Sequence, residues 1–159
     1  MAEAWPAVLR RVVHEAVVRH RAAHADAARY LAALSEPSDA LVESADALVR
    51  SGGGTAASLN QLIRNGQIDL FEIVLSRLLD LRLVSVRRIL YEPGGTALAV
   101  ALKAIQTPKP DLASIFIWSR QARPGDQSVD PKEVSRLLEL YDRIHPTAAQ
   151  WVLRRWQRD

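Results

Sequence analysis

The tetrapeptide Gly–Gly–Thr–Ala occurs twice in this sequence, at Gly53–Ala56 and at Gly94–Ala97, with a spacing of 41 residues. Two dipeptides recur in the same order at spacings of 42 and 43 residues: Asp69–Leu70 as Asp111–Leu112, and Ser76–Arg77 as Ser119–Arg120. A helical sequence with a period of about 40–47 residues is typical of two-helix solenoid units. The repeat therefore favours folds in which such units stack side by side.

Apolar residues follow helical spacing over almost the whole chain. Steps of three and four residues predict one long helix from about Pro6 to Leu34, since proline is tolerated in a first turn. The segment Val84–Glu92 contains β-branched residues that suit a strand, but no partner strand is available, so we expect a helix. The sequence thus predicts an all-α fold, a HEAT-like helical repeat or short α-solenoid with a long N-terminal helix. We expect residues 1–50 to supply that helix and a second one, and residues 51–159 to form a repeat domain packed with them as one compact unit.

Capping residues mark the expected helix starts. A side-chain oxygen at such a position accepts a hydrogen bond from a backbone N–H of the first helical turn. The expected caps are Ser38 or Asp39, Thr55, Asp69 together with Glu72, Thr96, Asp111, and Asp130 followed by Pro131 and Glu133. Turns rich in glycine, proline or asparagine, such as Pro93–Gly94–Gly95, separate the helices.

The glycine-rich stretch Ser51–Ile63, "SGGGTAASLNQLI", has the composition of a phosphate-binding loop. A P-loop, however, needs a Lys–Ser or Lys–Thr pair after its glycines and a strand before them, and this sequence has neither. The glycine spacing of a dinucleotide-binding turn is also missing. We therefore interpret the stretch as a joint between two helices, in which glycine permits positive φ and Thr55 caps the second helix.

Residues that could support catalysis or metal binding are few. His20 and His24 are four residues apart on the predicted first helix, but alanine and valine occupy the positions where a third metal ligand would lie. His145, before Pro146, is interpreted as a turn residue. The absence of cysteine excludes disulfides, thiolate nucleophiles and cysteine zinc sites. We expect no catalytic residue, no cofactor and no metal, and hence a protein that is not an enzyme.

The chain is basic, with a net charge of +3, but its charge is dispersed. Adjacent basic residues occur only at Arg10–Arg11, Arg87–Arg88 and Arg154–Arg155. A nucleic-acid-binding surface normally concentrates its basic residues in one stripe. No apolar run approaches the roughly 20 residues that span a bilayer, and Glu3 with Pro6 does not fit a signal peptide. We expect a cytoplasmic protein with no membrane partner.

Two groups of residues are candidates for partner binding. Arg82, Arg87 and Arg88 lie close together in "LRLVSVRR", where they form either a solvated face or a site for an acidic partner. Ile117 and Trp118 end the segment "LASIFIW", which is apolar on every side of a helix. Such a helix is usually enclosed in a core; the alternative is that Trp118 belongs to a binding patch.

The segment Leu59–Ile105 resembles a bacterial family best known from alphaproteobacteria and catalogued as domain of unknown function 2336. The residues that carry the resemblance are Leu62, Gly66, Asp69, Leu70, Phe71, Leu78, Val86, Arg87, Leu90, Gly94, Gly95 and Ala97. The tail Leu137–Trp156 is also similar to the end of that family. These are mostly core and turn residues, so the resemblance implies a helical fold and no catalytic motif.

The function expected from these observations is that of a non-enzymatic adaptor or regulatory module that binds another protein, because stacked helices offer a broad surface. A homodimer through the N-terminal helix is a further expectation. The alternative is a nucleic-acid-binding helical repeat, in which Arg77, Arg87, Arg88 and Arg120 share one concave surface and follow a phosphate backbone.

Overall fold

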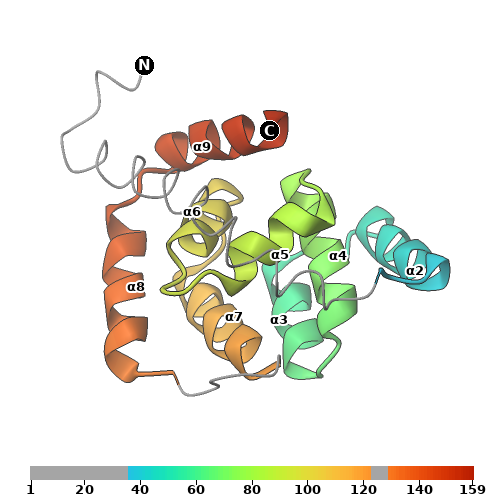
Figure 1. Ribbon diagram of the computed structural model, residues 1–159, viewed down its shortest axis with the longest axis horizontal. Helices are drawn as coiled ribbons and strands as arrows, with labels where there is room; N and C mark the ends of the chain where they lie inside the picture. Colours follow the sequence, from blue (N-terminus) through green and yellow to red (C-terminus); the bar gives the residue numbers. More distant parts are fainter. Residues whose placement is uncertain (1–35, 123–128) are drawn as a thin grey trace.

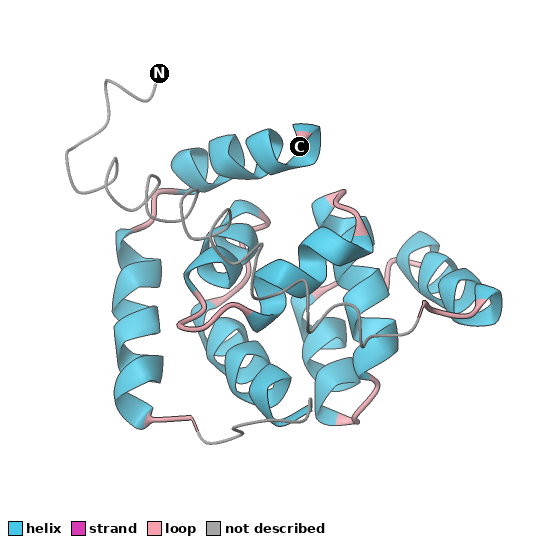
Figure 2. Cartoon of the chain, viewed as in Figure 1, coloured by secondary structure: helices cyan, strands magenta, loops and turns pink. Residues whose placement is uncertain are grey.

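The computed structural model describes residues 36–122 and 129–159, and these ranges contain eight helices and no strand (Figures 1 and 2). The helices are α2 (Asp39–Arg50), α3 (Ala56–Arg64), α4 (Ile68–Leu79), α5 (Leu83–Tyr91), α6 (Thr96–Ala104), α7 (Lys109–Ala122), α8 (Pro131–Arg143) and α9 (Pro146–Arg158). The prediction of an all-α fold is confirmed for this part of the chain, including the helix over the β-branched segment. The long helix predicted from Pro6 to Leu34 lies outside the described residues.

Helix α6 is the centre of the described structure. It packs against α5, α7, α8 and α9, and Figure 1 shows it between α8 and α5, below α9. Every residue of α6 except Lys103 is buried. Four alanines in its nine residues allow this, because small side chains let the surrounding helices approach closely on every side.

The opposite half of the array is organised around α4, which packs against α2, α3 and α5. Helix α7 connects the two halves through its contacts with α3, α5, α6 and α8. The two phenylalanines of the chain, Phe71 on α4 and Phe116 on α7, are both fully buried. In Figure 1, α2 lies at one end of the long axis of the molecule and α8 at the other.

Three of the predicted caps are confirmed. The hydroxyl oxygen of Ser38 accepts from the backbone N–H of Leu41 at the start of α2, and that of Thr55 accepts from Ser58 at the start of α3. The Asp130 carboxylate accepts from the N–H of Lys132, with Pro131 as the first residue of α8. Each is a contact within four residues, which a sequence pattern can predict.

The other predicted caps are wrong. Asp69 and Asp111 lie inside the first turns of α4 and α7, which begin at Ile68 and Lys109. Glu72 does not return to the helix start, because its side chain is buried against Arg87 on α5. Thr96 is the first residue of α6 rather than its cap.

The start of α6 is capped from outside the helix. The Glu92 carboxylate accepts a hydrogen bond of 2.8 Å from the backbone N–H of Ala97. Gly94 and Gly95, with φ of +84° and +72°, turn the chain back so that this carboxylate reaches the helix. In the first copy of the Gly–Gly–Thr–Ala sequence neither glycine has a positive φ, and Gly52 has it instead. The two copies therefore differ in backbone conformation although both precede a helix of nine residues.

Candidate functional site

The three arginines predicted to form a binding face on α5 do not share one environment. Arg82 is exposed and its backbone caps the helix start, whereas Arg88 is half-buried. Arg87 is only 8% exposed, and its Nε donates a hydrogen bond of 2.9 Å to Oε2 of Glu72, whose side chain is completely buried. Arg87 therefore joins α5 to α4 inside the protein, while Arg82 is available at the surface.

The arginines expected to form a nucleic-acid surface also differ in their exposure to solvent. Arg77 is exposed and paired with Asp46 on α2, with a distance of 2.6 Å between Nε and Oδ1. The half-buried guanidinium of Arg120 donates to the backbone carbonyl oxygens of Leu90 and Glu92 and lies 4.6 Å from the ring centre of Phe116. Since Arg87 is buried too, these arginines do not form one exposed surface. Two of them instead hold helices together.

Helix α7 has an inner and an outer side. Leu112, Ile115 and Phe116 are buried at the core. Ile117 is half-buried and Trp118 is 37% exposed, which makes Trp118 the one large hydrophobic side chain exposed among the described residues. The helix is therefore not enclosed on every side, and its outer side carries an accessible indole.

A hollow of about 330 Å³ lies beside the glycine-rich joint. It is lined by Gly54, Thr55, Ala56 and Leu59 from the start of α3, Leu78 from α4, and Ile105, Gln106 and Thr107 from the turn between α6 and α7. These residues offer aliphatic groups, hydroxyls and one amide, and no charged group. No positively charged side chain lines this hollow, so nothing in it favours the binding of a phosphate.

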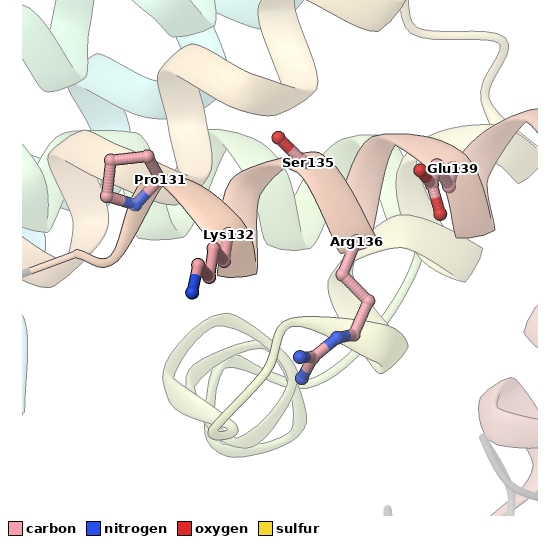
Figure 3. Close-up of a pocket in the computed structure, with 5 residues that line it drawn as sticks. All are labelled: Pro131, Lys132, Ser135, Arg136 and Glu139. Carbon is pink, nitrogen blue, oxygen red and sulfur yellow. The ribbon is translucent and has the colours of Figure 1, made fainter.

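A second hollow, of about 360 Å³, lies along α8. Figure 3 shows Lys132 and Arg136 extending to one side of the helix, with the Ser135 hydroxyl pointing away from them; Pro131 and Glu139 complete the lining. All five residues are exposed and come from one helix. This arrangement is a solvated face and provides no buried group that could orient a ligand.

A polar cluster surrounds Tyr141 of α8, and no sequence pattern indicated it. The Tyr141 hydroxyl donates to the backbone carbonyl of Thr107, and Lys103 Nζ lies 4.3 Å from the ring centre. Nearby, the Asn60 amide of α3 donates to the Asp111 carboxylate of α7. The partners are separated by 34 to 51 residues, so no local pattern reveals them.

The phenol of Tyr141 makes the stability of the protein sensitive to alkali. Burial, and secondarily the negative charge of Asp111, raises the pKa of Tyr141 from 10.0 to about 12. The neutral phenol is favoured in the folded state, so its contribution is complete below pH 10 and is lost as the pH rises toward 12. We expect on the order of 1–2 kcal/mol of the free energy of unfolding to be lost over this range through Tyr141. Urea unfolding at a series of alkaline pH values should show a steeper loss for the wild type than for Tyr141→Phe; parallel curves would contradict this assignment.

The described residues contain neither a metal-binding cluster nor a helix that could span a membrane. His20 and His24 lie outside them, and His145 accepts at Nδ1 from the N–H of Thr147 as the cap of α9. Residues 36–122 and 129–159 contain no group of three or more histidine, aspartate or glutamate side chains placed to hold a metal ion. Within the same residues, no helix has the length and apolar character needed to cross a membrane.

The described chain is thus an all-helical protein whose buried charges stabilise its own packing. A model of a family described as an uncharacterised protein conserved in bacteria (DUF2336) matches residues 2–154, and the chain belongs to that family. The match extends well beyond the two segments on which the resemblance rested. Neither a curated protein nor a solved structure matches the chain.

Proposed function

We propose that this chain is a non-enzymatic adaptor or regulatory module with a HEAT-like helical repeat, and that it binds another protein through the outer side of α7. The observation that carries the proposal is the 37% exposure of Trp118 beside the half-buried Ile117. Tryptophan is among the residues that most often dominate the energy of protein interfaces, since its large ring is removed from water when a partner binds. Arg82, exposed at the start of α5, is a candidate for additional contact.

The contacts of the buried and half-buried charged groups support a role in binding rather than in catalysis. Glu72, Arg87 and Arg120 are occupied in holding helices together, which leaves no cluster of buried charges in the described part that a substrate would reach. A helical array with an exposed aromatic side chain suits recognition better than chemistry. A cytoplasmic location and a homodimer through the N-terminal residues remain parts of the proposal, the latter outside the described ranges.

Substitution of Trp118 tests the proposal. We expect Trp118→Ala to weaken binding to the cellular partner at least roughly tenfold, as for an interface residue of large effect. The free energy of unfolding should change by only about 0.5 kcal/mol, because the side chain is at the surface. The measurement is affinity capture from a nuclease-treated lysate of the source organism, followed by titration of the captured protein.

Gln61→Ala provides a control, since Gln61 is an exposed residue on α3 and does not belong to the proposed binding side of α7. It should leave the affinity unchanged. Equal affinities of the wild type and Trp118→Ala would contradict a binding site on α7. Bound material that disappears with nuclease or added salt would favour the nucleic-acid alternative.

A further inference from the structure

The first and the last of the described helices, α2 and α9, carry opposite charge. Residues 36–54 contain four acidic residues and one arginine, whereas residues 143–159 contain four arginines and one aspartate. In the structure, Glu36, Asp39 and Glu43 are exposed on and just before α2. Arg154, Arg155 and Arg158 are exposed on α9. The asymmetry is thus present on the surface and not only in the sequence.

Among the described residues, helix α2 is covered on one side only. It packs chiefly against α4, and Ala45 is the one residue of α2 that is fully buried. Four aliphatic side chains of α2 flank Ala45 and pack against the core while remaining partly exposed: Leu41, Val42, Leu48 and Val49. The exposed acids therefore stand beside an incompletely covered apolar border.

Helix α9 is the corresponding element at the other end of the described chain. It packs chiefly against α6, with Ala149, Val152 and Trp156 buried on its inner side. Its arginines lie on the opposite side, and Figure 1 shows α9 above α6, apart from α2. One copy of the protein therefore presents an acidic helix and a basic helix on different parts of its surface.

We infer that copies of this chain associate head to tail, with the acidic side of α2 on one copy against the basic side of α9 on the next. A second copy supplies the complement of both faces at once, whereas a nucleic acid would satisfy α9 and repel α2. Such a contact joins two different surfaces, so it forms rings or open chains rather than a closed symmetric pair. Opposite charge brings the faces together and sets their register, and the aliphatic border of α2 provides the area removed from water.

Sedimentation velocity of the full chain over a wide concentration series tests this inference. We expect reversible association at low salt that weakens roughly tenfold in high salt, because exposed charges are screened. Glu36→Lys combined with Glu43→Lys should abolish the salt-sensitive part of this association, and so should Arg154→Glu combined with Arg158→Glu. An equimolar mixture of the two double variants should associate again, since each then offers the charge that the other lacks.

Helix α8 supplies matched controls with the same changes in net charge. Glu133→Lys with Glu139→Lys, and Lys132→Glu with Arg136→Glu, alter exposed residues away from both faces and should leave association intact. A wild type without salt-sensitive association, or a mixture of the α2 and α9 variants in which that association does not return, would overturn the inference. Binding of an oligonucleotide by α9 without self-association would also overturn it.

Discussion

Replacement of Arg87 by methionine is expected to lower the free energy of unfolding by about 3–5 kcal/mol. The Glu72 carboxylate, fully buried on α4, would lose the guanidinium that contacts it at 2.9 Å. A buried carboxylate in this position must bind a proton or draw water into the core, and either event disfavours the folded state. Chemical denaturation monitored by circular dichroism measures the effect.

Two further variants separate the ion pair from the loss of a side chain. Glu72→Leu combined with Arg87→Met removes both charges and should recover most of the lost stability, because a buried pair often does no better than apolar residues of similar volume. Arg82→Met removes an exposed arginine near the start of the same helix and should change stability by only about 0.5 kcal/mol. If Arg87→Met cost no more than Arg82→Met, the pair would not stabilise the fold.

The substitution Gly95→Ala should lower the free energy of unfolding by about 2–4 kcal/mol. A Cβ atom at this position would lie 2.8 Å from two ring carbons of Phe116 and 3.3 Å from Leu137. Gly95 also has φ of +72°, a left-handed conformation that disfavours a side chain. Both the conformation and the packing therefore oppose the added methyl group, and thermal or urea unfolding will show it.

Gly66→Ala measures how much of the loss in the free energy of unfolding comes from the positive φ alone. Gly66 has φ of +74°, almost the same as Gly95, but a Cβ there would meet no atom within 4 Å. Its alanine variant should lose only about 1 kcal/mol. Equal losses at the two positions would show that the contact with Phe116 adds nothing.

Local contacts account for what the sequence predicted correctly. The caps made by Ser38, Thr55 and Asp130 involve residues at most three positions apart, and each follows a rule for a single helix turn. The enclosure of α7 on every side, which its apolar sequence predicted, was wrong because Trp118 is exposed on the outer side. The cap made by Glu92 on Ala97 escaped prediction because it depends on the turn through Gly94 and Gly95.

The candidate site was harder to predict, because a sequence does not show whether a charged side chain points into the core or toward solvent. Arg87 and Arg88 are neighbours in "VRR", yet only a folded structure shows that Arg87 meets Glu72 across two helices. Arg120 is similar, since its partners are backbone carbonyls at Leu90 and Glu92. Every residue has a backbone carbonyl, so the sequence does not indicate which of them will accept a hydrogen bond from an arginine. Trp118 was identified as a candidate from the sequence. Its exposure could be determined only once the positions of the surrounding helices were known.

The short helix α5 is fastened from both sides, to α4 through Arg87 and to α7 through Arg120 at its C-terminal end. Stacked repeats that touch only their neighbours can open one at a time from an end. Here the release of α5 breaks attachments in both halves of the described array. We therefore expect the described residues to unfold as one cooperative unit, with the backbone amides of α5 among the slowest to exchange.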